Sequence, residues 1–287
     1  MNQRIYPCIW CNNNAKEVAG YYSATFPNTS IMQSNPVVVM VNLDGQPLML
    51  LNGGDTFKPN PSISLMGLFS NPEEVKSLWA KLIGEGSGLM PLGSYPFSPQ
   101  YGWLVDKFGV SWQLYTGETG GAKESYVPTL LFTGANNGRA KEAISFYTGL
   151  FPDSKLQGIM EYAEGSGETP GNVQHAQFDV LGFTIMCMDS SLPHPFNFNE
   201  GVSIVVNCHN QEEIDLYWNT LTANGGQESR CGWLKDKFGV SWQIVPENIG
   251  QLMSQSPNVM NVLMKMNKLD MAMLEAAATG KLPKPSG

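Results

Sequence analysis

The 287-residue sequence has few charged side chains and very few histidines. Asp, Glu, Lys and Arg make up 15% of it, only three residues are histidine, and the formal net charge is −8. Because no basic stripe could neutralise phosphates, we expect neither a nucleic-acid partner nor a membrane partner. With so few ionisable groups, acid–base or metal chemistry would depend on a small number of residues.

Cysteine is also scarce, and longer apolar runs are missing. The five cysteines are odd in number and scattered, so they predict no disulfide framework and a place in the reducing cytoplasm. Cys8 and Cys11 have redox or zinc spacing, but strand positions three apart face opposite sides, and no second pair follows. No segment is long enough to span a bilayer. No Gly-x-Gly-x-x-Gly links a strand to a helix, so we expect no cofactor such as a dinucleotide or methyl donor.

What the sequence does contain is a repeat. Residues 102–114 (GWLVDKFGVSWQL) return as residues 232–244 (GWLKDKFGVSWQI), with eleven of thirteen positions identical. Such a match in two Trp-rich segments indicates a tandem duplication. The predicted parts are a first domain over 1–117, a linker over 118–125, a second domain over 126–247 and a helical tail over 248–287.

Within each half, a strand, a helix and further strands follow one another twice, which predicts an α+β fold. Asp44-Gly45 marks a hairpin. Asn71 and Asn210 each precede a helix, with a glutamate three residues on, which is the reciprocal capping pattern.

Two other composition signals concern loops and the tail. The Gly/Pro/Ser-rich stretches over 90–101 and 158–171 predict loops. In the tail, Met260, Met264 and Met271 recur at helical spacing, and we expect them to fill a core.

Paired units that end in Gly-Trp-x-x-Asp-x-Phe-Gly-Val-Ser-Trp-Gln resemble the vicinal oxygen chelate superfamily, the glyoxalase, bleomycin-resistance and extradiol-dioxygenase group. Residues 140–147 (AKEAISFY), 175–178 (HAQF) and 264–270 (MKMNKLD) resemble its PhnB-like branch, often labelled 3-demethylubiquinone methyltransferase. The resemblance implies tandem domains, each of two βαβββ units curled around a pocket. It also implies a dimer-like pairing within the chain. Whether pockets lie within or between domains, and whether the chain forms a homodimer, stays open.

In metal-dependent members of this superfamily, His or Glu occupies four inward-facing strand positions. By strand order these positions correspond to Pro7 and Pro128, to Met49 or Leu50 and Cys187, to Ser64 and Ser203, and to Gln113 and Gln243. None is a histidine or a carboxylate, so the mapping predicts a pocket without a metal.

His175 is the ionisable residue best placed to act, and its counterpart in the first half is Val38. We interpret it as a pocket base or hydrogen-bond donor near Cys187, the alternative being a partly buried structural histidine. Cys187 is a nucleophile only if His175 lowers its pKa. His209, beside an N-cap, is expected to be structural. The candidate catalytic residues are His175 and Cys187, and the predicted ligand-binding residues are Trp10, Ser64, Gln113, Phe132, Tyr162, His175, Cys187, Ser203 and Gln243.

The function predicted first is binding of an uncharged or cationic small organic molecule in a metal-free pocket. One alternative is a metal-dependent lyase, isomerase or dioxygenase of the same superfamily. Another is a scaffold whose first half has lost its pocket. Methyl transfer, suggested only by the family label, has no support in the residues, and whether the protein is an enzyme stays open.

Overall fold

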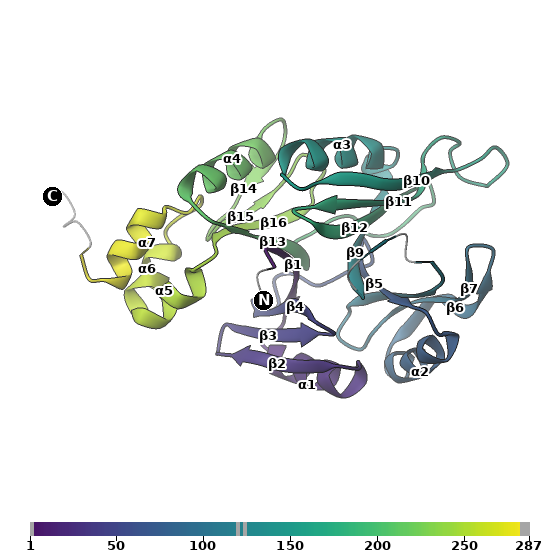
Figure 1. Cartoon of the computed structure of the whole chain (residues 1–287), viewed down its shortest axis with the longest axis horizontal. Coiled ribbons are helices and arrows are strands. Elements are labelled where there is room, and N and C mark those ends of the chain that lie inside the picture. The colour runs from purple at the N-terminus through teal and green to yellow at the C-terminus, as the bar shows by residue number, and fades with distance from the viewer. Residues whose placement is uncertain (1–2, 119–120, 123–124, 282–287) are drawn as a thin grey trace. The chain divides into compact units, whose positions relative to one another are not determined.

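A computed structural model describes residues 3–118, 121–122 and 125–281 (Figure 1). The chain divides into two compact units, Tyr6–Val202 and a smaller one made of Met1–Ile5 with Ser203–Gly287. Four residues of the predicted linker (119–120 and 123–124) and the end of the predicted tail (282–287) lie outside the described residues. None of the described helices combines the length and apolar character needed to cross a membrane.

The larger unit contains most of the strands. Its elements are β1 (Ile5–Cys11), α1 (Ala15–Thr25), β2 (Thr29–Ser34), β3 (Val38–Leu43), β4 (Gln46–Asn52), β5 (Ile63–Phe69), α2 (Pro72–Ile83), β6 (Ser87–Tyr95), β7 (Ser98–Val105), β8 (Ser111–Thr116), β9 (Tyr126–Thr133), the short η1 (Gly134–Asn136), α3 (Ala140–Leu150), β10 (Lys155–Glu161), β11 (Val173–Val180) and β12 (Phe183–Ser190).

The smaller unit contains the last strands and the tail. Its elements are β13 (Val202–Cys208), α4 (Gln211–Thr222), β14 (Gln227–Glu228), β15 (Trp233–Lys235), β16 (Ser241–Pro246), α5 (Ile249–Gln255), α6 (Pro257–Leu263) and α7 (Met271–Ala278). Its strands pair in the order β14-β15-β16-β13.

An eight-stranded sheet in the larger unit has the order β10-β11-β12-β9-β5-β8-β7-β6. Strands β5 to β8 belong to the first repeat and β9 to β12 to the second, so both repeats build this sheet. The two sets meet where β5 pairs antiparallel with β9. The remaining strands of the unit pair in the order β1-β4-β3-β2. The predicted α+β class is confirmed.

The repeated segment folds as strand, tight turn and strand because a buried carboxylate holds the turn. Asp106 Oδ1 accepts hydrogen bonds from the backbone N–H groups of Phe108 (2.8 Å) and Val110 (3.1 Å). Its Oδ2 accepts from Trp112 Nε1 and the Tyr22 hydroxyl, both at 2.9 Å. Burial raises the pKa of Asp106, and these four bonds oppose the rise by favouring the charged form.

The second copy repeats the turn. Asp236 accepts from the backbone of Phe238 (2.9 Å) and Val240 (3.0 Å) and from Trp242 Nε1 (2.9 Å). The glycine of each turn has φ near the left-handed region, +84° at Gly109 and +88° at Gly239, which explains the glycine in both copies.

Both predicted N-caps are present. Asn71 Oδ1 accepts from the Glu73 N–H (3.0 Å), and Asn210 Oδ1 accepts from the Glu213 N–H (2.9 Å). At the second cap, Glu213 returns a bond to the His209 N–H (2.8 Å) rather than to Asn210 itself. The donor of the reciprocal bond is therefore the residue before the N-cap rather than the N-cap residue that the pattern predicts.

Other expectations were wrong. Most of 90–101 forms the strands β6 and β7 rather than a loop, and the first residues of 158–171 belong to β10. In the tail, Met264 is 51% exposed, and leucine and valine side chains such as Leu263 fill the interior. The physical reason is that β6 and β10 lie at the two edges of the sheet, where mostly exposed side chains leave no clear alternation.

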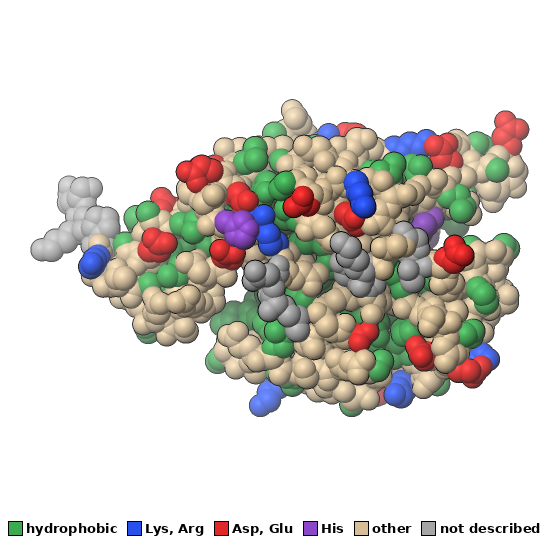
Figure 2. All heavy atoms as spheres, viewed as in Figure 1, with side chains coloured by type: hydrophobic (Ala, Val, Ile, Leu, Met, Phe, Trp, Pro, Cys, Tyr) green, Lys and Arg blue, Asp and Glu red, His purple; other side chains and the backbone are tan. Residues whose placement is uncertain are grey.

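The low charge of the sequence is visible at the surface. On the face shown in Figure 2, red and blue side chains are interspersed among large uncharged areas rather than gathered into one patch.

Asp106→Ala should lower the free energy of unfolding by about 3–5 kcal/mol, because four donors lose their acceptor. Trp112→Phe, which keeps an aromatic ring and removes one donor, should cost about 2 kcal/mol. Equilibrium urea unfolding measures both. Glu164 is exposed, so Glu164→Ala serves as the control and should stay within about 0.5 kcal/mol of the parent protein. A loss for Asp106→Ala as small as that of the control would contradict this account of the turn.

Candidate functional site

The two faces of the eight-stranded sheet have different surroundings. Leu65, Leu104 and Trp112 occupy neighbouring positions on one face and pack into a hydrophobic core with side chains of α2. Because side chains alternate along a strand, Ser64 and Gln113 point to the opposite face. The indole of Trp112, held by the turn, thus determines which way Gln113 faces.

The opposite face carries four uncharged polar side chains that we call the polar row: Tyr101, Gln113, Ser64 and Thr129. The Tyr101 hydroxyl donates to Gln113 Oε1 (2.6 Å), and Gln113 Nε2 donates to Ser64 Oγ (2.7 Å). Thr129 lies directly opposite Ser64 on the neighbouring strand. All four are buried; Gln113 is 2% exposed and Thr129 is 1% exposed.

Apolar side chains flank the polar row on the same face. Met66 lies opposite both Gln113 and Val127, and Met186 lies opposite Thr129. Met66, Val127 and Met186 belong to one small buried cluster. The face therefore combines a central polar group with an apolar, polarisable surround, as small-molecule sites do.

Strand register displaces two predicted inward positions by one residue. Leu65 lies opposite Pro128 and Cys187 lies opposite Leu130, so Pro128 and Cys187 face the same side as Trp112. Their neighbours Thr129 and Met186 face the side of Ser64 instead, with Thr129 opposite Ser64 and Met186 opposite Thr129. The residue types at these places are a hydroxyl and a thioether, again without histidine or carboxylate.

Cys187 and His175 are not brought together. Cys187 lies opposite Ala176, the residue after His175, so the two side chains point to opposite faces. Burial, and secondarily the charge of Asp189, raises the pKa of the Cys187 thiol well above its ordinary value. A thiol in this state is a poor nucleophile.

His175 lies on the face of the polar row, in β11, opposite Met160. It is half-buried, and burial lowers its pKa from the ordinary value of 6.5. Within the part of the chain that the structure describes, its ring makes no hydrogen bond. The imidazole is thus predominantly neutral at pH 7 and able to accept or donate one bond.

The predicted aromatic residues occupy other places. Phe132 faces the same side as Leu130 and contacts the ring of Phe198 edge-on, with centroids 5.1 Å apart. Trp10 is in β1, where its Nε1 donates to the Gly54 carbonyl (2.9 Å). Tyr162 follows β10, and burial raises its pKa to about 12. None of the three shares the strand positions of the polar row.

The smaller unit contains the second copy of the Gln–Ser pair. Gln243 Nε2 donates to Ser203 Oγ (3.0 Å), as Gln113 does to Ser64. Cys231 replaces the tyrosine that precedes the first copy, and its Sγ lies 3.6 Å from Met264 Sδ. The pair recurs, whereas the phenol that holds the first glutamine does not.

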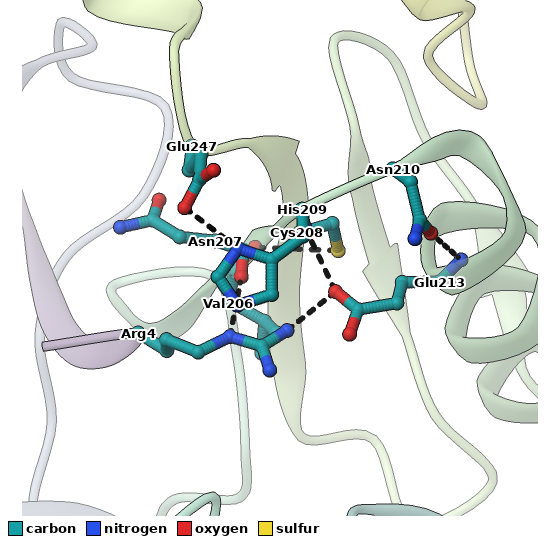
Figure 3. Close-up of polar contacts among 8 residues, drawn as sticks. All are labelled: Arg4, Val206, Asn207, Cys208, His209, Asn210, Glu213 and Glu247. Atoms are coloured by element: carbon teal, nitrogen blue, oxygen red, sulfur yellow. Dashed lines mark hydrogen bonds and ion pairs between the residues drawn. The ribbon is translucent and has the colours of Figure 1, made fainter. Parts of the chain in front are cut away.

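Figure 3 shows a cluster of charged side chains in the smaller unit. Arg4 pairs with Glu213, and His209 Nδ1 lies 2.8 Å from Glu247 Oε2. Arg4 Nε also donates to the Asn207 carbonyl (3.3 Å), while the Asn207 N–H donates to the Arg4 carbonyl (2.7 Å). The cluster fastens the beginning of the chain to β13 and α4, which agrees with a structural role for His209.

The donor set on this face does not fit a divalent metal ion. Hard cations prefer anionic oxygens, and softer ones prefer imidazole or thiolate. The polar row provides only neutral groups: two hydroxyls, a phenol and an amide, of which the phenol and the amide are bonded to each other. Across the described ranges, no three His, Cys, Asp or Glu side chains come together in a way that could hold a metal.

Sequence reasoning missed Tyr101 and Thr129. Tyr101 lies one residue before the repeated segment, and the second copy has Cys231 instead of a tyrosine at that position. Thr129 was missed because Pro128 was placed on the inward face. Only the register of β5 against β9, which joins the two repeats, identifies it.

Comparisons with known proteins identify the family of the chain and one solved structure with the same fold. The sequence matches the family described as 3-demethylubiquinone-9 3-methyltransferase over residues 3–115 and again over 124–245. It is 32% identical to a PhnB protein from Bacillus cereus, over 40% of this chain and 100% of that one, with a TM-score of 0.38. Glyoxalase I from Zea mays shares the fold at 11% identity, over 85% of this chain and 94% of that one, with a TM-score of 0.55. No curated protein matches the chain.

His175 should make the stability of the protein depend on pH. Because its folded pKa is below 6.5, the unfolded chain binds a proton that the folded protein does not, and the free energy of unfolding falls as pH falls below about 6.5. In His175→Gln this part of the fall should disappear. Urea unfolding at several pH values between about 5 and 7.5 measures the difference. Parallel pH profiles of the two proteins would contradict the lowered pKa.

Proposed function

The chain belongs to the family described as 3-demethylubiquinone-9 3-methyltransferase, a PhnB-like branch of the vicinal oxygen chelate superfamily. We propose that it binds a small uncharged organic molecule at the polar row and that this binding needs no divalent metal. The proposal depends on one observation above all. Buried, uncharged polar side chains stand in the middle of the sheet face that α2 does not cover.

In this proposal the polar row orients the ligand. The Tyr101 hydroxyl fixes the Gln113 amide, and the amide in turn fixes Ser64 (2.6 and 2.7 Å). A preorganised hydrogen-bonding group costs less to immobilise when a ligand binds. Met66, Val127 and Met186 would contact the apolar part of the ligand, and the net charge of −8 disfavours an anion.

The other predicted ligand-binding residues take secondary places in the proposal. His175 could donate or accept one further hydrogen bond from the same sheet face. Ser203 and Gln243 would form a corresponding group in the smaller unit. No step is assigned to Cys187, because its thiol is buried on the other face.

Fluorine NMR with three fragments of similar size tests the proposal. 4-Fluoroacetophenone, which is uncharged, should broaden and shift on addition of the protein, whereas the anion 4-fluorobenzoate should not. Gln113→Leu should weaken binding of the uncharged fragment about tenfold, since the row loses its central hydrogen bonds. The cation 4-fluorobenzylamine shows whether charge of that sign is tolerated.

The control variant is Gln251→Leu, the same change at an exposed position of α5, and it should leave binding unchanged. EDTA should also leave binding unchanged. A stoichiometric divalent ion in the purified protein, with binding lost in EDTA, would support the metal-dependent alternative instead. Preferential binding of S-adenosylmethionine would favour the methyl transfer named in the family description.

A further inference from the structure

Two hydroxyl groups lie on neighbouring strands at one end of the polar row. Ser64 and Thr129 lie opposite each other on β5 and β9, and residues so paired have Cβ atoms about 5 Å apart. Thr129 Oγ1 is fully buried and has no hydrogen-bond partner within the described residues. A buried hydroxyl without a partner loses its hydration and gains nothing in return, so its retention at this place requires a reason.

The hydrogen bonds of the row also give Ser64 a direction. Gln113 Oε1 accepts the Tyr101 proton, which leaves Gln113 Nε2 to donate to Ser64 Oγ. The Ser64 oxygen is therefore an acceptor toward Gln113, and its own proton points elsewhere. No described residue accepts that proton.

The surroundings restrict what could accept it. Every member of the polar row is uncharged, so nothing in the row would balance an anion. The flanking side chains, Met66, Val127 and Met186, are apolar, and thioethers contact aromatic rings favourably. An acceptor that is uncharged, has two lone pairs and is attached to an apolar body fits these conditions.

We propose that the Ser64 and Thr129 hydroxyls together donate to one carbonyl oxygen of an uncharged ligand, in the place where metal-dependent relatives would use a cation. This inference rests on the proposed function and narrows it to ketones, amides and related carbonyl compounds. The two hydrogen bonds distinguish a carbonyl from an apolar group of the same size, because the analogue would leave both hydroxyls without an acceptor.

The test compares 4-fluoroacetophenone with 1-ethyl-4-fluorobenzene, which lacks only the carbonyl, by fluorine NMR. The parent protein should bind the ketone at least tenfold more tightly. Ser64→Ala and Thr129→Val should each remove most of that preference. Thr133→Val is the matched control: its hydroxyl is also buried without a partner among the described residues, but it lies roughly 13 Å further along β9, so the preference should persist.

The outcomes separate the two proposals. Equal binding of both fragments, or a preference that survives in Thr129→Val, would overturn the carbonyl assignment while leaving the proposed function intact. Binding of neither fragment would overturn both.

A second measurement needs no ligand. Thr129→Val should raise the Tm of the free protein by about 2–4 °C, because it removes a buried hydroxyl that has no acceptor. The combination of higher Tm and weaker ketone binding is expected only of a hydroxyl reserved for a ligand. A lower Tm for Thr129→Val would show that the hydroxyl serves the fold, and would contradict the proposal.

Discussion

The carboxylate of the Asp-Lys-Phe-Gly turn is the interaction on which the arrangement of this protein depends. It ties two backbone N–H groups of the turn and one indole N–H together, at Asp106 and again at Asp236. Fixing the indole on the core side leaves the next residue, Gln113 or Gln243, on the other face. The same short segment thus determines the fold of each repeat and the direction of its glutamine.

The cost of this arrangement is the burial of a negative charge. Burial raises the pKa of Asp106, and hydrogen bonds from Trp112 and Tyr22 and from the backbone oppose that rise. Because every donor of the turn would lose its acceptor together, the turn is a cooperative unit rather than a set of separate contacts.

Local features could be predicted from the sequence, and long-range ones could not. The duplication, the caps at Asn71 and Asn210 and the α+β class follow from short patterns of residue type. Pro128 was assigned to the wrong face because alternation gives relative directions only, and a shift by one residue exchanges the faces. The pairing of Ser64 with Thr129 could not be predicted either, since it joins strands of different repeats. The domain boundaries and the roles of His175 and Tyr162 stay predictions.

The antiparallel pairing of β5 with β9 also has an evolutionary consequence. In an assembly of two identical chains, every substitution appears twice, and both copies of a site must tolerate it. Here β5 and β9 are parts of one polypeptide, and the short connection between the repeats gives the two strands a high effective concentration. One copy can therefore keep Tyr101 and the other Cys231, or one Val38 and the other His175, without disturbing recognition between them. Because the two copies are joined in one chain, each can change its sequence independently while it stays paired with the other.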